Sequence, residues 1–223
     1  MVETPLLEAV DLYRFFHVGD SETRALRGVS LRVFPGETVA LLGPSGSGKS
    51  TLLACLAGLD EPDGGHVLLA GERLTRRPEA ERARRRAATI GILLQSGNLF
   101  ESLPLAAAIR LQMHLAGQRD AARPERLLAA VGLAGRENAK PAHLSGGERA
   151  RAGLAVALAA EPALLLADEP TGEVDAETER ALLALLADRK RAGLAALIAT
   201  HSAALAQWAD RVLTIADGRF ADA

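Results

Sequence analysis

The sequence predicts an α/β domain built on a mainly parallel β-sheet that is covered on both faces. Three observations indicate this class. Short, almost continuously apolar runs alternate with helical segments, as expected for strands that are buried on both sides. A glycine-rich loop stands between one such run and a helix. A long middle region is helical only, which predicts a helical lobe inserted into the sheet.

The first third of the sequence predicts four strands and one helix. The strands are expected over residues 6–11, 29–34, 38–42 and 66–70. The second alternates apolar and polar residues, and the third is a short continuous apolar run that follows a turn at Pro35 and Gly36. The helix is expected over 49–57 and should end at Gly58.

The rest of the sequence predicts the helical middle and the remaining strands. The strands are expected over residues 89–95, 163–167, 194–199 and, as the last one, 212–215. Between 96 and 160 the pattern is helical, with breaks at Gly117, Pro124, Gly132 and Pro141. An amphipathic helix is expected over 176–191. We therefore predict a single domain over 1–223, with a helical subdomain at about 96–160 inserted in its core.

An arginine-rich stretch over 73–86 is interpreted as a solvated helix. Its cluster of like charges comprises Arg82, Arg84, Arg85 and Arg86. Glu79 and Glu81 stand on the same predicted helix and can act as counterions. A surface for anionic lipid or nucleic acid is the alternative interpretation.

The composition fits one large domain and excludes several classes of protein. The 223 residues, 48% of them hydrophobic, are enough to bury a sizeable core. A formal net charge of −2 argues against nucleic acid as the main partner, because that partner normally needs a basic field. The single cysteine, Cys55, rules out an intrachain disulfide framework and suits a reducing compartment. Its place on an apolar helix predicts that it is buried.

The sequence shows no signal for entering a membrane. Its first eleven residues hold acids and a proline where a signal peptide has a basic stretch and an apolar run. The longest apolar candidate for a spanning helix, 152–167, is interrupted by Glu161 and Pro162. We therefore expect a soluble chain that reaches a membrane only when a partner holds it there.

A complete P-loop pattern lies between the strand at 38–42 and the following helix. It comprises Gly43, Pro44, Ser45, Gly46, Ser47, Gly48, Lys49, Ser50 and Thr51. Its glycines allow positive φ and a close approach of backbone N–H groups to phosphate oxygens, and the helix dipole favours an anion at the same place. Lys49 would charge-pair with the β- and γ-phosphates, and the Ser50 hydroxyl would ligate Mg²⁺. A nucleotide site is predicted; the alternative is a glycine-rich turn with an exposed lysine.

Two acidic residues follow the buried strand at 163–167. Ligands collect at the carboxyl ends of the strands in such sheets, so Asp168 would lie beside the phosphates and hold the metal through water. Glu169 is the candidate for polarising an attacking water. Two acids after a strand, with Pro170 behind them, more often begin a helix, but the P-loop upstream favours the catalytic interpretation.

A third motif, Leu144-Ser145-Gly146-Gly147-Glu148, lies between those two. Taken alone, it is the capped N-terminus of a helix. In this order of motifs it resembles the signature of the ABC family of ATPases, and the resemblance covers essentially the whole chain. It implies an ABC-type P-loop NTPase fold, with a RecA-like sheet, an N-terminal antiparallel β part and a helical insertion. It also implies ATP and Mg²⁺ as cofactors, and a head-to-tail dimer in which residues 145–148 reach the γ-phosphate held by the partner subunit.

The resemblance assigns roles to further residues. Gln95 stands at the Q-loop glutamine, which would sense the metal and the γ-phosphate, and the D-loop falls on 172–175. His201 matches the switch histidine, which would donate to the γ-phosphate and orient the water. The predicted catalytic residues are therefore Lys49, Glu169 and His201. The predicted metal ligands are Ser50, Gln95 and Asp168.

An aromatic residue near the start completes the expected nucleotide site. Phe16 has the spacing at which the family stacks an aromatic ring on adenine. Phe15 or Tyr13 could serve instead, and a packed aromatic residue without a ligand is the remaining alternative.

The sequence departs from the family pattern near the expected dimer interface. Glu148 stands where many members have glutamine, and Arg149 and Ala150 stand where a Gln-Gln pair is frequent. Glu173 and Val174 replace the usual Ala/Asn-Leu of the D-loop. None of these changes removes a catalytic group, so they bear on turnover rate and dimer affinity.

Segments 90–95 and 168–172 resemble one branch, the ATPases paired with permeases of the macrolide-export, lipoprotein-release and cell-division type. This branch implies a cytoplasmic ATPase, peripheral on the inner face of the cell membrane. It would power export or release by a permease that docks near 96–115, and intact motifs favour a homodimer. The alternative is a non-transport ATPase that regulates a membrane protein controlling a periplasmic or cell-wall enzyme.

Overall fold

Two β-sheets form the frame of this computed structural model, which describes residues 4–18, 21–172 and 174–221. The strands are β1 (Leu7–Val18), β2 (Ser21–Val33), β3 (Thr38–Leu42), β4 (Gly64–Leu69), β5 (Glu72–Arg73), β6 (Ile90–Leu93), β7 (Leu164–Asp168), β8 (Ala195–Ala199), β9 (Arg211–Ala216) and β10 (Arg219–Phe220). An antiparallel sheet has the order β2-β1-β4-β5, and a second sheet has the order β10-β9-β3-β8-β7-β6. The second sheet is parallel except for β10 at its edge. The predicted fold class is confirmed.

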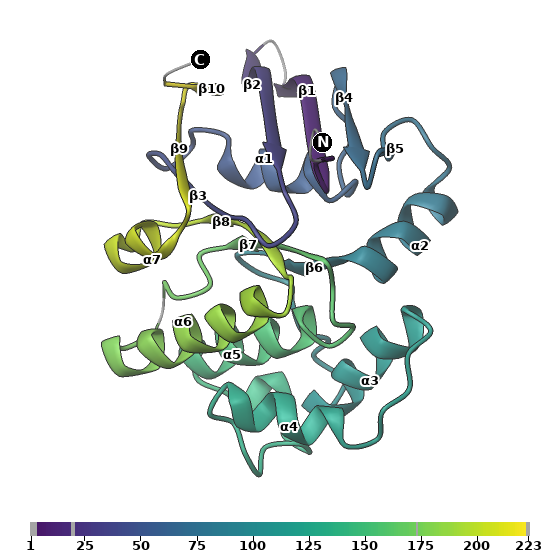
Figure 1. The fold of residues 1–223 in the computed structure, drawn as a ribbon, viewed down its shortest axis with the longest axis vertical. Coiled ribbons are helices and arrows are strands. Elements are labelled where there is room, and N and C mark those ends of the chain that lie inside the picture. Colours follow the sequence, from purple (N-terminus) through teal and green to yellow (C-terminus); the bar gives the residue numbers. More distant parts are fainter. Residues whose placement is uncertain (1–3, 19–20, 173, 222–223) are drawn as a thin grey trace.

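The helices lie on both sides of the parallel sheet. They are α1 (Lys49–Leu56), α2 (Glu79–Thr89), α3 (Leu105–Leu115), α4 (Arg123–Ala130), α5 (Gly146–Ala157), α6 (Ala176–Arg191) and α7 (Ala203–Trp208), with a 3-10 turn at Pro141–His143. Figure 1 shows α1 between the two sheets, α5 and α6 beyond the other face of the parallel sheet, and α3 and α4 farthest from the antiparallel sheet. None of the described helices has both the length and the apolar character that crossing a membrane requires.

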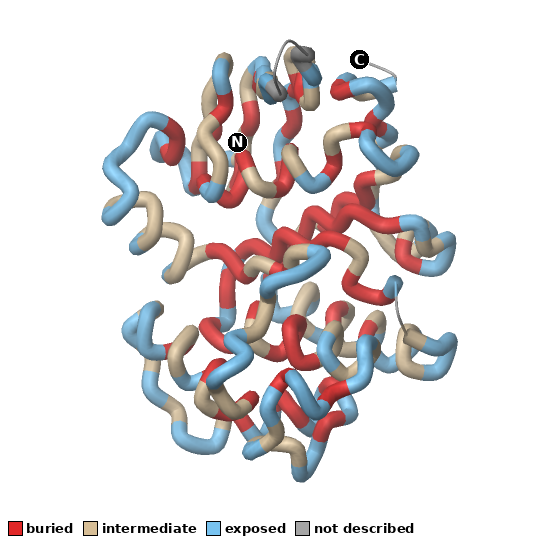
Figure 2. The backbone as a smooth tube through the Cα atoms, turned by 180° about the vertical axis from the view of Figure 1, so that it is seen from behind, coloured by how far each residue is buried: buried red, intermediate tan, exposed pale blue. Residues whose placement is uncertain are grey.

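The central strands explain why their sequences are apolar throughout. Leu164 and Leu166 of β7 pack into a core cluster with α1 and the antiparallel sheet. Leu165 and Ala167, which point to the opposite face, belong to a second cluster with α3, α5 and α6. Figure 2 shows the resulting band of buried residues across the middle of the molecule. Cys55 is buried in the first cluster, as predicted.

Several elements differ from the sequence prediction because pairing over long distances decides them. β1 continues beyond residue 11 to Val18, and β2 begins before residue 29, at Ser21. In these added parts the two strands pair with each other across register shifts. β5, α7 and β10 were not predicted, because each has six residues or fewer and carries no periodic pattern. Pro124 lies in the first turn of α4, where a proline is tolerated, and does not interrupt a helix.

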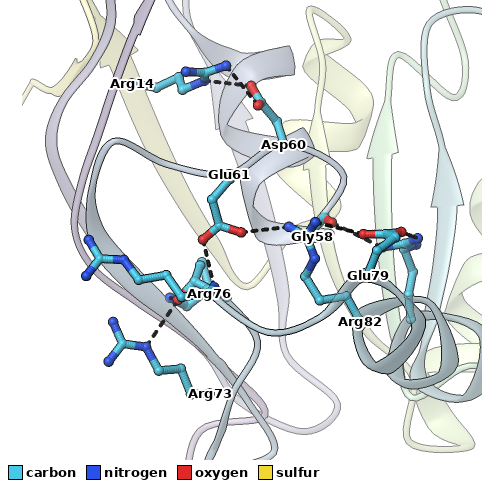
Figure 3. A network of polar contacts seen from close by, with 11 residues as sticks. Arg14, Gly58, Asp60, Glu61, Arg73, Arg76, Glu79 and Arg82 are labelled. Atoms are coloured by element: carbon cyan, nitrogen blue, oxygen red, sulfur yellow. Dashed lines mark hydrogen bonds and ion pairs between the residues drawn. The ribbon is translucent and has the colours of Figure 1, made fainter.

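The arginine-rich helix α2 begins at Glu79, later than predicted, because the backbone before it forms β5 and a turn. Its predicted counterions are confirmed: Glu79 pairs with Arg82 and Arg86, and Glu81 pairs with Arg85. Arg82 also pairs with Glu61, which follows the end of α1 (Figure 3). The arginines therefore join α2 to the segment behind the P-loop helix.

Candidate functional site

A cavity of about 670 Å³ opens at the carboxyl ends of the parallel strands. The predicted site residues that line it are Phe16, Ser45, Gly46, Gly48, Lys49, Ser50, Thr51, Gln95, Asp168, Glu169 and His201. They come from β1, the P-loop and α1, and the ends of β6, β7 and β8. The structure therefore brings together, in one cavity, motifs that are spread over most of the sequence.

The phosphate loop has the backbone that its glycines predict. Gly48 caps α1 with a φ of 106°, in the left-handed region, and a Cβ there would collide with the carbonyl oxygen of Ala25. The helix α1 starts at Lys49 and directs its free N–H groups toward the cavity. Both the positive φ and the lack of space for a Cβ therefore require glycine at position 48. The other predicted loop residues, Gly43, Pro44 and Ser47, are not among those that line the cavity.

Lys49 is folded over its own loop. Its Nζ donates hydrogen bonds to the carbonyl oxygens of Gly43, at 2.7 Å, and Pro44, at 3.0 Å. The residue is 8% exposed, yet it lines the cavity. Two carbonyl oxygens thus hold the ammonium group at the loop, and one of its three N–H donors remains for a further partner.

One hydroxyl oxygen and one carboxylate oxygen meet at one corner of the cavity. Ser50 Oγ, on α1, donates a hydrogen bond of 2.5 Å to Oδ2 of Asp168, at the end of β7. Asp168 is 5% exposed, and Gln95 lines the same cavity from the segment after β6. Hydroxyl, carboxylate and amide oxygens are ligands that suit Mg²⁺, so the residues present fit that ion.

Glu169 and His201 lie beside each other in the cavity, after the ends of the neighbouring strands β7 and β8. Glu169 has a φ of 52°, and its backbone N–H donates to the carbonyl oxygen of Ala199 at 2.9 Å. Its Oε2 accepts the backbone N–H of His201 at 3.3 Å, and its Oε1 lies 3.5 Å from His201 Nε2. The left-handed backbone at Glu169 is a strained conformation of the kind found at functional sites.

The aromatic residue that lines the cavity is Phe16. Tyr13 and Phe15 instead pair with each other, with ring centroids 6.2 Å apart, and neither lines the cavity. The guanidinium of Arg14 lies 4.5 Å from the Phe16 ring centroid and is held by two hydrogen bonds to Asp60, at 2.8 and 2.9 Å (Figure 3). Arg14 does not line the cavity, so it braces the ring from outside.

Some lining residues could not be found from the motifs. Arg24 and Arg27 of β2 and Asp217 and Gly218 of the β9–β10 turn also line the cavity. The backbone N–H of Arg27 donates to the carbonyl oxygen of Gly218 at 2.8 Å. Their place depends on this contact between the two sheets, for which the sequence holds no local signal.

The signature residues lie away from this cavity. Ser145 caps α5 in a capping box: its Oγ accepts the N–H of Glu148 at 3.2 Å, and its N–H donates to Glu148 Oε2 at 2.9 Å. The backbone N–H of Ser145, followed by Arg136, lowers the pKa of the Glu148 carboxyl to about 2. Ser145, Gly146, Gly147 and Glu148 do not line the cavity that holds the P-loop. Within one chain the structure therefore keeps the signature and the phosphate loop apart.

A second cavity of about 580 Å³ connects the two regions. It shares Gln95, Asp168, Glu169 and His201 with the first cavity, and Gly146 and Arg149 of α5 also line it. Of the predicted D-loop, Glu173 lies outside the described residues, and Asp175 caps α6 by accepting the backbone N–H of Glu177 and Thr178.

The sequence matches the family model described as "ABC transporter" over residues 26–172. Among curated proteins, it is 41% identical to the lipoprotein-releasing system ATP-binding protein LolD of Acinetobacter baylyi, over 97% of this chain and 97% of that protein. It is also 41% identical to the macrolide export ATP-binding/permease protein MacB of Chlorobium luteolum, over 96% of this chain but 33% of that protein.

A solved structure has the same fold. It is the dimeric post-hydrolysis state of the ATP-binding cassette MJ0796 bound to ADP and Pi, with a TM-score of 0.93 and 29% sequence identity. The match covers 96% of this chain and 96% of the solved one.

Proposed function

Because this chain belongs to the ABC transporter family and is an ATP-binding and ATP-hydrolysing subunit of it, we propose that it works as one of two identical subunits that power a membrane permease of the export or release type. One observation carries the proposal. The P-loop, Asp168, Glu169 and His201 line a single cavity in the arrangement that hydrolysis of a nucleoside triphosphate requires.

Each group has a role that follows from its position. The N–H groups at the start of α1 and the Lys49 ammonium would bind the β- and γ-phosphates. Glu169 would take the proton of the attacking water, since its carboxylate lies at the cavity between the ends of β7 and β8. His201 Nε2, 3.5 Å from Glu169, would donate to the γ-phosphate on the same side.

We assign the Mg²⁺ site to Ser50, Asp168 and Gln95. Ser50 and Asp168 already lie within hydrogen-bonding distance of each other, and Gln95 lines the same cavity. The ion would neutralise charge on the phosphate oxygens. These three residues would hold their oxygen atoms beside the phosphate loop as ligands of the ion.

A second copy would complete the site. Ser145, Gly146 and Gly147 begin α5, where the helix N-terminus favours an anion, but within one chain they lie outside the nucleotide cavity. A head-to-tail dimer would place this segment against the γ-phosphate of the facing copy. The MJ0796 cassette, which is 29% identical, was solved as a dimer bound to ADP and Pi, which supports a dimer of this chain as well.

The segment 96–115, within the helical subdomain that we place at 96–160, would dock the permease. Phe100 and Leu115 are 58% and 60% exposed there. An apolar groove of about 330 Å³ lies between α2, α3 and α5, and its lining includes Leu115 of α3 and Arg84 of α2. Exposed apolar side chains beside a groove are typical of a protein interface. The resemblance to LolD and MacB supports our proposal that the chain lies on the inner face of the membrane, held there by the permease.

Nucleotide binding can be tested separately from permease docking. Replacing Lys49 with alanine should weaken ATP binding by about 2 to 5 kcal/mol, because a buried charge-assisted contact is lost. Isothermal titration of ATP with Mg²⁺ measures this, and Lys190→Ala is the matched control, since Lys190 pairs with Asp210 outside the cavity. Undiminished ATP affinity in the Lys49 variant would contradict the proposal.

Docking can be tested with a charge in the groove. The substitution Leu115→Asp should prevent co-purification of the chain with its permease from detergent-solubilised membranes, while ATP binding stays unchanged. Leu59→Asp is the control, because Leu59 is 46% exposed and lies outside the groove. Equal recovery of the permease with both variants would exclude this docking surface.

A further inference from the structure

One carboxylate oxygen joins the two segments that carry Glu169 and His201. Oε1 of Glu179, in the first turn of α6, accepts a hydrogen bond from Thr171 Oγ1 at 3.1 Å and another from Ser202 Oγ at 2.6 Å. Thr171 stands two residues after Glu169 and is 6% exposed. Ser202 directly follows His201. Glu179 therefore links the end of β7 to the end of β8 from a third element.

The contacts around Glu179 close into a ring. The backbone N–H of Ser202 donates to Thr200 Oγ1 at 3.0 Å, and Thr200 Oγ1 lies 3.5 Å from Glu169 Oε2. On the other side, the N–H of Gly172 donates to the carbonyl oxygen of Glu169 at 3.2 Å. Ser202 Oγ also accepts the N–H of Leu205, so its hydroxyl both donates and accepts. The ring leaves little freedom for Glu169 relative to Thr200.

We propose that Glu179 is a positioning residue for ATP hydrolysis, which fixes Glu169 relative to His201. This inference rests on the proposed function. Glu179 is not among the described residues that line either cavity, so it does not touch the nucleotide and acts through Thr171 and Ser202. The helix α6 provides a fixed support, because Asp175 caps its N-terminus. Holding two reacting groups in one geometry lowers the barrier of a step that needs both.

The geometry makes the replacement by glutamine informative. Both hydroxyl donors bind the same oxygen, Oε1, and an amide oxygen accepts two hydrogen bonds as a carboxylate oxygen does. Glutamine can therefore keep both contacts without the negative charge, whereas alanine loses both. A role that depended on the charge alone would be lost in either variant.

The test compares steady-state ATP hydrolysis by the full chain and its variants. For Glu179→Ala we expect kcat to fall about tenfold with the KM for ATP unchanged within about twofold, because the phosphate loop is untouched. Glu179→Gln should restore most of kcat. The control is Glu177→Ala, which removes an exposed carboxylate from the same turn of α6. Measuring at several protein concentrations separates an effect on the chemical step from one on dimerisation.

The outcomes that overturn the inference are distinct from failure of the proposed function. Wild-type kcat in Glu179→Ala, or a Glu179→Gln variant as slow as alanine, would overturn it. If Glu179→Ala does not fold, Thr171→Val is the second variant, because it removes one hydroxyl and keeps the shape of the side chain. Its kcat should fall about threefold at unchanged KM. A wild-type kcat in Thr171→Val would also overturn the inference. A wild-type chain that does not hydrolyse ATP would instead contradict the proposed function.

Discussion

The Ser50 hydroxyl, on the P-loop helix, donates a hydrogen bond of 2.5 Å to the Asp168 carboxylate, at the end of β7. The two residues are 118 positions apart in the sequence. Their contact joins the phosphate loop to the strand end that carries both acids. It therefore holds, at one corner of the cavity, the two oxygens that we propose as Mg²⁺ ligands.

Removing the Ser50 hydroxyl should raise the Mg²⁺ concentration needed for ATP hydrolysis. We expect Ser50→Ala to lower activity at a fixed, subsaturating Mg²⁺ concentration by about 10- to 100-fold, because one oxygen ligand is lost and Asp168 loses its partner. Titrating Mg²⁺ in an ATPase assay measures the shift. Ser30→Ala is the control, since Ser30 contacts Asp11 on the exposed side of the antiparallel sheet. An unchanged Mg²⁺ dependence would contradict the assignment of Ser50.

Replacing Glu169 with glutamine should separate binding from hydrolysis. The amide cannot take a proton from water, so multiple turnover should fall by about 100-fold or more, while ATP binding persists. The bound, unhydrolysed ATP should then hold two copies together, which size-exclusion chromatography with Mg²⁺ and ATP would detect as a dimer. Hydrolysis at the wild-type rate in this variant would mean that another group serves as the base.

The Phe16 ring should contribute to ATP affinity through the base alone. Phe16→Ala is expected to weaken ATP binding by about 1 to 3 kcal/mol, the usual value of base–aromatic stacking. Binding of inorganic triphosphate, which lacks a base, should not change. Phe100→Ala serves as the control, because Phe100 is 58% exposed and does not line the cavity. Equal losses for ATP and triphosphate would indicate a disturbed phosphate loop instead of a lost stack.

The capping box of α5 should make stability depend on pH in the acid range. The pKa of Glu148 is lowered from 4.5 to about 2, chiefly by the backbone N–H of Ser145 and then by Arg136. A lowered folded-state pKa means that the stabilisation is fully present above pH 4.5 and is lost as the pH falls toward 2. The difference in unfolding free energy between wild type and Glu148→Gln should therefore shrink across this window.

Urea denaturation at several pH values between 7 and 2 measures that difference. Glu125→Gln, which removes an exposed carboxylate from α4, corrects for the general effect of losing one negative charge. A constant difference between wild type and Glu148→Gln over the whole range would show that the carboxylate does not hold the cap.

The sequence predicts those parts of the site whose chemical groups stand close together along the chain. The P-loop needs glycines, a lysine and a hydroxyl in one short segment, and the acids at 168 and 169 need only an apolar strand before them. The structure brings both to one cavity, with Gln95 and His201, because parallel strands present their carboxyl ends at one edge of the sheet. Phe16 was one of three aromatic candidates until the cavity distinguished them.

Other parts depend on contacts between distant segments, which no local pattern records. The position of the Phe16 ring depends on Arg14 of β1 and on Asp60, which follows α1. The part of the cavity lined by Arg27 and Gly218 depends on the hydrogen bond between these two residues. The bonds of Glu179 to Thr171 and Ser202 form only when α6 packs beside the ends of β7 and β8. The sequence by itself determined the fold class and the groups for phosphate chemistry. Only the tertiary structure decided which side chains hold those groups in place, because such contacts are set by packing in three dimensions.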